Sequence, residues 1–335
     1  MRRVSMLNRV KLRDGTALEE PYAMKSTSGP SPIRFNTLRF TDIDQYRQAV
    51  RLLQIDFIPL SRVISAAQKT LSLPGCYVQL IDSFPRLVDA QLASNCTFVG
   101  LTMDDRTSMR FNTAENDRPT LAIGHGQSGY KQIETASSRF ASIIFTPEIR
   151  DRGWPESRKD FTTVFTSDRA FSRLRLLISS IFESGNDDSA SRTLGAALGI
   201  KESLLGAIDS AFADINPKME IRRPHLSRHF SIIQDIDSLF AINTQAPLYS
   251  DDLAEKLGVS IRTIHNAVKL YRGMSLHRYL RLKRLWLVRQ NLMAGGQSVK
   301  ACALAYGFWH LGDFARAYRE LFDESPSETL SKVRS

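Results

Sequence analysis

The stretches DDLAEKLGVSIRTIHNAV, residues 251–268, and VKACALAYGFWHLGDFARAY, residues 299–318, decide how the carboxy-terminal part of this chain folds. In each stretch, apolar positions recur at helical spacing, a glycine follows, and a second short helix with a partly polar face begins. Gly258 and Gly307 stand where the first helix ends, because glycine adopts the left-handed conformation of a helix terminus without strain. Each stretch therefore predicts a helix-turn-helix unit.

The first unit separates an inner face from an outer one. Its inner positions are Leu253, Ala254, Leu257, Ile264 and Val268, and Ser250 and Ser260 are the expected N-caps of its two helices. The residues left outside are Arg262, His265, Asn266 and Lys269. Arginine pairs with guanine and asparagine with adenine in the major groove, while lysine neutralises phosphate. This face has the chemistry of a DNA reader, although His265 suits a phosphate, a base or no partner equally.

Residues 276–293, LHRYLRLKRLWLVRQNLM, contain no helix breaker and predict one continuous helix. At 1.5 Å per residue this helix is about 27 Å long. Successive major-groove segments on one side of B-DNA are about 34 Å apart. The helix therefore has the length to hold two reading units near one turn of DNA apart.

The second unit repeats the pattern, but some of its outer residues have no side chain that can hydrogen-bond to a base. Its inner residues are Val299, Cys302, Ala303, Tyr306, Phe314 and Tyr318, and its outer candidates are His310, Leu311, Gly312, Asp313, Arg316 and Arg319. Trp309 has two interpretations, packing at the turn or contact with DNA, and the first is favoured. Trp286 is expected in the core.

Composition agrees with a polyanionic partner but does not prove one. The 335 residues carry a formal net charge of +10 and are 42% hydrophobic, enough for two domains plus tails. Cys76, Cys96 and Cys302 lie far apart without metal or disulfide spacing, which suits a reducing cytosol, so no metal or cofactor is expected. No apolar run approaches the length of a membrane span, so we expect a cytoplasmic protein without membrane contact.

The amino-terminal part is read as β-rich. Residues 1–34 predict a disordered basic tail, and residues 35–146 alternate as short strands, among them CYVQLI, RLVDAQLA, CTFVGLTM, TLAIGHG and FASIIFTP. They suit a small barrel or sandwich that either encloses a ligand or is filled by side chains. Helices are expected at 42–53, 168–182 and 197–212, followed by a linker at 216–228. The fold class is therefore α+β with two domains.

Two features of this part leave alternatives open. The apolar stripe of the helix at 168–182 either packs on the strands or pairs with a second copy; it consists of Phe171, Leu174, Leu177, Ile178 and Ile181. The GHGQSG segment, residues 124–129, superficially resembles a nucleophile elbow, but Ser128 lacks the glycine two places before it. We interpret that segment as a β-turn and expect no enzyme.

The segments LAEKLGVS (253–260), GMSLHRYLRLKR (273–284) and ALAYGFWHLGDFARAYRELFDESPSETL (303–330) resemble the DNA-binding domain of the AraC/XylS family of bacterial transcription regulators. GFWH and PSETL are most similar to the branch that includes ethanolamine-utilisation regulators. The resemblance implies a DNA-binding domain at 229–335, with helix-turn-helix units at 250–270 and 299–320. It also implies a cupin-like effector-sensing and dimerisation domain at 35–215.

The resemblance carries DNA contacts onto particular residues. Base reading falls on Arg262, His265 and Asn266 in the first unit and on Leu311, Gly312 and Arg316 in the second, and the family's recurrent arginine of the connecting helix falls on Arg284. Trp309, Leu311 and Gly312 depart from the small polar residues or glutamine usual in the family. Because Gly312 has no side chain, we expect the second helix to contribute mainly phosphate contacts, with Leu311 meeting a thymine methyl.

These observations predict a sequence-specific regulator, an activator, whose partners are double-stranded promoter DNA, a small-molecule effector, RNA polymerase and a second copy in a homodimer. One alternative is a regulator without a ligand, controlled by its abundance or by a protein partner. Another is an enzyme or carrier domain fused to a DNA reader.

Overall fold

The computed structural model describes residues 31–49, 53–104, 109–115, 118–157, 159–184, 193–215, 224–242, 247–295 and 298–334. The tail predicted at 1–34 lies mostly outside these residues. Its last four residues are described, and β1 already begins at Arg34. Most of the linker predicted at 216–228 lies outside them as well.

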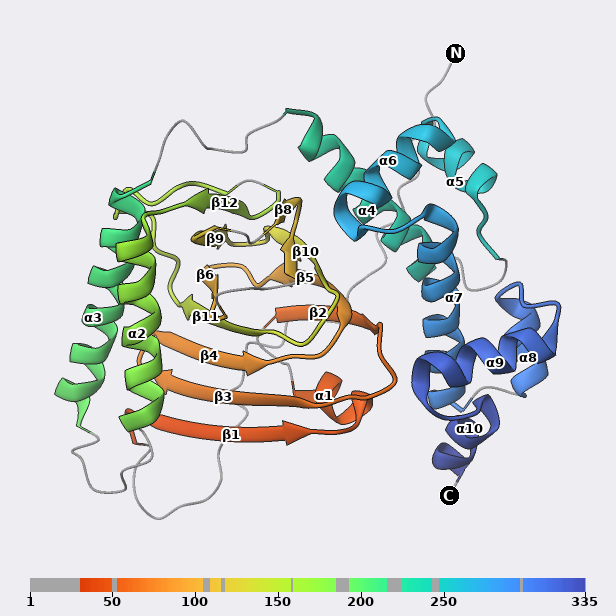
Figure 1. The fold of residues 1–335 in the computed structure, drawn as a ribbon, viewed down its shortest axis with the longest axis horizontal. Coiled ribbons are helices and arrows are strands. Elements are labelled where there is room, and N and C mark those ends of the chain that lie inside the picture. Colours follow the sequence, from red (N-terminus) through yellow and green to blue (C-terminus); the bar gives the residue numbers. More distant parts are fainter. Residues whose placement is uncertain are drawn as a thin grey trace. The chain divides into compact units, whose positions relative to one another are not determined.

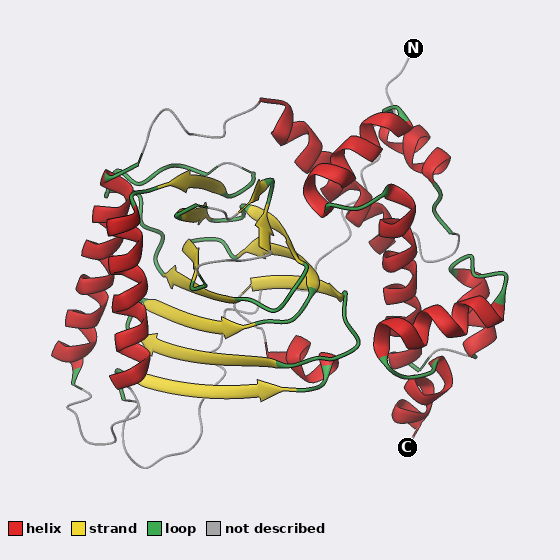
Figure 2. Cartoon of the chain, in the orientation of Figure 1, coloured by secondary structure: helices red, strands yellow, loops and turns green. Residues whose placement is uncertain are grey.

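Two antiparallel sheets form the amino-terminal part (Figures 1 and 2). The seven-stranded sheet contains, in spatial order, β1 (Arg34–Phe40), β3 (Ala66–Leu73), β4 (Cys76–Asp82), β11 (Arg139–Phe145), β6 (Thr97–Thr102), β9 (Thr120–His125) and β12 (Thr162–Phe165). The five-stranded sheet contains β2 (Leu53–Pro59), β5 (Arg86–Leu92), β10 (Gly129–Glu134), β7 (Met109–Phe111) and β8 (Ala114–Glu115). The expected β-rich domain is confirmed as a two-sheet sandwich.

Both faces of the seven-stranded sheet are covered. In β4, Val78 faces the outer core under the helices, whereas Tyr77 and Gln79 face the interior between the sheets. This explains the period-two pattern of CYVQLI, since alternate side chains of a strand point to opposite faces. The pattern separates two buried environments rather than core from solvent.

Helices α2 (Asp168–Ser184) and α3 (Leu194–Ala213) cover the outer face of the seven-stranded sheet (Figure 1). Phe171, Leu174 and Ile178 are buried in the same core as Val99 and Ile143 of the sheet. The apolar stripe therefore packs on its own chain, and it gives no support to pairing with a second copy.

The prediction of a helix at 42–53 is wrong at its carboxyl end. The structure has α1 at Ile43–Ala49, and Leu53 is already the first residue of β2. Leu53 is buried in the sandwich, so long-range strand pairing overrides the helical spacing that links it to Tyr46 and Val50. The segment at 124–129 is a turn as expected, with the Ser128 amide donating to the His125 carbonyl oxygen at 2.9 Å.

The carboxy-terminal part is all helical: α4 (Pro224–Ile242), α5 (Ser250–Leu257), α6 (Ile261–Arg272), α7 (Leu276–Met293), α8 (Val299–Ala305), α9 (Leu311–Phe322) and α10 (Pro326–Arg334). Helix α7 confirms the predicted connecting helix at both ends. Helix α4 begins inside the predicted linker, five residues before the expected domain start at 229. Residues 32–335 form one compact unit, so the sandwich and the helices share a core although they differ in architecture.

Candidate DNA-binding surface

Helices α5 and α6 form the first helix-turn-helix unit. Gly258 ends α5 with a φ of +62°, and Ser260 begins α6 by accepting a hydrogen bond from the Thr263 amide at 3.1 Å. The expected N-cap at Ser250 is wrong by one residue. Tyr249 precedes the helix, and its amide donates to the Asp252 carboxylate at 2.8 Å. Local hydrogen bonds thus fix both ends of the turn.

Helix α6 has a sharply divided surface. Ile264, Ala267 and Val268 are completely buried. Four predicted DNA-contact residues share the opposite face at a spacing of about one helical turn and are exposed: Arg262, His265, Asn266 and Lys269. Ser260 is exposed at the start of this face. The structure therefore brings all the predicted contacts of the first unit together.

Helices α8 and α9 form the second unit, joined through Gly307 at a φ of +78°. Phe314 and Tyr318 are buried, while His310, Leu311, Gly312, Arg316 and Arg319 are exposed. Arg316 lies 3.2 Å from Asp313 in an exposed pair, which is too weak to withhold it from phosphate. His310 precedes α9 without a side-chain cap, so the first amides of that helix are not occupied by it.

Trp309 corrects a sequence expectation, because it does not pack at the turn. Its side chain is 65% exposed, beside the exposed His310 and Leu311. The turn is instead filled by Phe308, whose ring lies 5.1 Å from that of Phe314. This large exposed aromatic side chain on the outer face of the second unit is a candidate for DNA contact, in place of the packing role that the sequence favoured.

Replacing Trp309 by alanine should leave the fold intact and weaken DNA binding. Stability should change by no more than about 0.5 kcal/mol, since an exposed side chain contributes little to folding. Binding should weaken by up to about 3 kcal/mol if the ring becomes buried against DNA. Val333→Ala, at another exposed apolar residue, is the matched control. A lower midpoint temperature of thermal unfolding, with unchanged DNA binding, would mean that Trp309 packs in the protein instead of contacting DNA.

Arg284 does not lie with the other predicted contacts. It is only 8% exposed, and its guanidinium carbon lies 5.4 Å from the Tyr249 ring centre and 5.3 Å from the Phe308 ring centre. Burial lowers the pKa of this guanidinium below its ordinary value, an effect that the Tyr249 hydroxyl partly offsets. Its DNA contact stays a prediction, and its surroundings are those of an interior residue.

A buried group of charges fixes α6 and α7 against the five-stranded sheet. Asp89 on β5 and Asp237 on α4 accept from three cations: Lys131 on β10, Arg272 at the end of α6, and Lys283 on α7. Lys131 Nζ lies 2.7 Å from Asp89 Oδ1 and 2.6 Å from Asp237 Oδ2. The Tyr279 hydroxyl donates to Asp237 at 2.7 Å.

This ion cluster keeps its charges in spite of burial. Desolvation opposes ionisation of Asp89, but attraction by Arg272, Lys131 and Lys283 holds its pKa well below the ordinary range. The carboxylates on α4 and β5 likewise raise the pKa of Lys283 well above its usual value. This cluster could not be predicted from the sequence, because its members are spread from residue 89 to residue 283.

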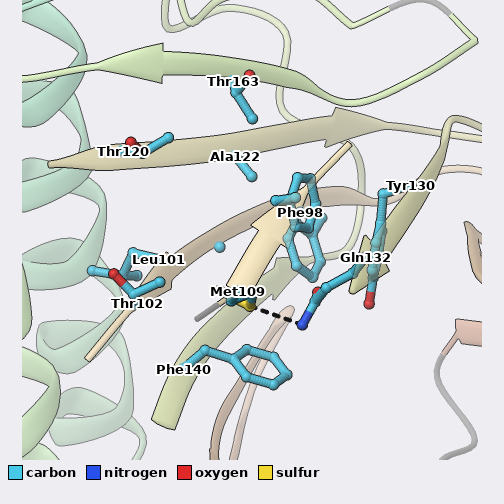
Figure 3. A pocket seen from close by; sticks show the side chains of 12 residues that line it. Phe98, Leu101, Thr102, Met109, Thr120, Ala122, Tyr130, Gln132, Phe140 and Thr163 are labelled. Atoms are coloured by element: carbon cyan, nitrogen blue, oxygen red, sulfur yellow. Dashed lines mark hydrogen bonds between the residues drawn. The ribbon is translucent and has the colours of Figure 1, made fainter. Parts of the chain in front are cut away.

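The interior between the sheets is nearly filled. One cavity between the sheets has a volume of ≈ 20 Å³. Figure 3 shows Phe98, Met109 and Tyr130 around Gln132, whose side-chain nitrogen lies 2.8 Å from the Met109 sulfur. A second cavity, also of ≈ 20 Å³, borders Gln79, Arg86 and Ser142. Each has room for about one water molecule. Neither of these two cavities has space for an effector in this conformation.

The comparisons with known proteins concern mainly the helical part. Residues 253–332 match a helix-turn-helix domain family. A probable AraC family transcriptional regulator from Rhodopseudomonas palustris, known from its crystal structure, is 34% identical; the match covers 31% of this chain and 99% of that one, with a TM-score of 0.28. The chain belongs to the AraC/XylS family.

Two characterised relatives of this AraC/XylS protein are similar over the same region. The XylDLEGF operon transcriptional activator of Pseudomonas putida is 35% identical over 28% of this chain and 30% of its own length. The transcriptional activator RhaS of Pectobacterium carotovorum is 32% identical over 22% of this chain and 26% of its own length. The chain thus matches about a third or less of these relatives, and the placement near ethanolamine-utilisation regulators remains a prediction.

No helix in the described ranges is long and apolar enough to cross a membrane. Within the same ranges, no three histidine, cysteine, aspartate or glutamate side chains gather as metal ligands would.

Proposed function

We propose that this AraC/XylS protein is a sequence-specific regulator of transcription that binds double-stranded promoter DNA through both helix-turn-helix units. The observation that carries the proposal is the exposed face of α6, where Arg262, His265, Asn266 and Lys269 stand together over a buried core. Arg316 and Arg319 on α9 add positive charge at the second unit. The first unit supplies most of the base discrimination and the second mainly holds the backbone.

Selection of bound duplexes from a random-sequence library by the full chain tests this function. We expect an enriched site spanning two groove segments, with stronger sequence preference in the segment that α6 reads. Affinity should fall steeply with salt, because each neutralised phosphate releases counterions. Failure to enrich any sequence, with equal weak binding to all duplexes, would contradict a sequence-specific regulator.

Two roles are considered for the β-sandwich: sensing a small molecule, or a regulatory role without a ligand. The domains proposed are residues 35–215 for sensing and dimerisation and 229–335 for DNA binding, and the family character favours an activator that answers a small molecule and contacts RNA polymerase. The filled interior supports the alternative, a regulator without a ligand that is controlled by abundance or by a protein partner. An effector would have to displace the rings of Phe98 and Tyr130.

The remaining proposals concern surroundings and assembly. A homodimer would use an outer surface of the helices over the seven-stranded sheet, where Leu176, Leu194 and Leu198 are exposed. Regulation of promoters places the protein in the bacterial cytoplasm, at the nucleoid when bound. No enzymatic step is proposed.

A further inference from the structure

The two helix-turn-helix units have separate cores. Leu253, Ile264 and Val268 of the first unit belong to the core that reaches into the sandwich, together with Trp286 of α7. Phe314 and Tyr318 of the second unit belong to another core, together with Leu285 of α7. Two neighbouring residues of α7, Leu285 and Trp286, therefore belong to different cores. Leu282, Leu287 and Phe322 pack against both cores, so contacts at this level of α7 fix the second unit relative to the first.

Arg284 stands at this junction and touches both units. The Tyr249 ring belongs to the segment that enters α5, and the Phe308 ring belongs to the turn between α8 and α9. A guanidinium at 5.4 Å and 5.3 Å from two ring centres is at cation–π distance from each. One side chain of the connecting helix therefore joins the two units by the same interaction.

Gly307 shows how closely the units approach at Arg284. A Cβ added there would lie 2.7 Å from the Pro247 side chain, 2.9 Å from the Tyr249 hydroxyl and 3.1 Å from an Arg284 nitrogen. The left-handed φ of Gly307 already disfavours any other residue. The glycine that makes the turn of the second unit thus also lets the first unit and Arg284 pack against it.

The arginine has aromatic partners rather than an acidic one. Within the described residues, no carboxylate lies within ion-pair distance of its guanidinium, and its buried Nε has no hydrogen-bond partner. Lys283 beside it on the same helix is held by two carboxylates. An arginine is suited to this slot because its planar, weakly hydrated guanidinium stacks on rings as lysine does not.

We propose that Arg284, held in the slot formed by Tyr249, Phe308 and Gly307, is a positioning residue that sets the separation of the two reading helices. It does so from the interior and touches no DNA. The effect of Arg284 on DNA binding rests on the proposed DNA-reading function. Its effect on the separation of the two units can be measured in the free protein.

The first test measures this geometry without DNA. Spin labels on cysteines introduced at Glu255 and Glu320, both exposed and outside the predicted contacts, report the distance between the units in the full chain. The native cysteines are buried, and protein without introduced cysteines controls for their labelling. Arg284→Met should broaden or shift the distance distribution, and Arg284→Lys should restore it only in part.

The matched control is Arg278→Met, which removes an exposed arginine earlier on α7, away from the slot, and should leave the distribution unchanged. Phe308→Leu removes one ring while keeping an apolar side chain, and should broaden the distribution even if Arg284→Met folds poorly. An unchanged distribution in folded Arg284→Met overturns the proposal.

The second test uses the duplex selected by the wild-type chain and two versions with one groove segment randomised. Arg284→Met should weaken binding to the intact duplex about tenfold, since loosely linked units lose effective concentration for each other. Binding to the single-segment duplexes and the salt dependence should not change. Equal loss on every duplex, with a salt slope reduced by about one, would show a phosphate contact and overturn the proposal. Absence of any selected site would count against the regulatory function, while the distance test stands.

Discussion

Replacing Asp89 by asparagine should lower the free energy of unfolding by about 3–5 kcal/mol, the cost of removing one partner from a buried ion pair. Arg272 and Lys283 would lose a carboxylate that they now share, and Asp237 alone would face three cations. Arg272 is completely buried, so water has no access to replace the lost charge. Urea unfolding of the full chain gives the measurement.

Asp82→Asn is the matched control for this loss. Asp82 also pairs with an arginine, Arg139, but both side chains are about half exposed. Exposed pairs contribute about 0–1 kcal/mol, so this variant should unfold almost as the wild type does. Similar losses in the two variants would mean that the ion cluster at Asp89 contributes no more than a surface pair.

Alanine at Arg262 or Asn266 should weaken binding to the selected duplex by about 1–3 kcal/mol and change binding to random DNA little. Both side chains are exposed on α6 above a fully buried inner face, so their removal leaves the fold unchanged. The physical reason for the selectivity is that a bidentate contact with a base edge exists only on the correct sequence. Titration of both duplexes at one salt concentration checks it.

Lys269→Ala provides the comparison within the same helix. Lys269 lies on the same exposed face but carries a point charge suited to phosphate, so its removal should weaken binding to both duplexes alike. It should also reduce the salt slope by about one. If Arg262→Ala and Asn266→Ala behave like Lys269→Ala, these residues contact the backbone, and sequence is read elsewhere.

The reading units could be predicted because their signals are local. Gly258 and Gly307, each followed within a few residues by the next helix, mark the turns, and the breaker-free run from 276 to 293 marks α7. The outer face of α6 follows from helical spacing alone. The strands of the amino-terminal part were harder to predict from the sequence. Of the twelve strands in the described ranges, only β4, β5, β6, β9 and β11 coincide with the strand segments expected from the sequence. The other seven lie outside those segments, and Leu53, which begins β2, lies where the sequence predicts a helix.

The presence of two helix-turn-helix units joined by one helix follows from local sequence patterns, and so does the side of α6 that carries Arg262, His265, Asn266 and Lys269. Long-range packing, by contrast, exposes Trp309 to solvent, buries the apolar stripe at Phe171 against the sheet and pairs Asp89 with Arg272. It also placed Arg284 between Tyr249 and Phe308. The reason is the range of the interactions: helical periodicity acts over a few residues, whereas burial and ion pairing join residues far apart in the chain.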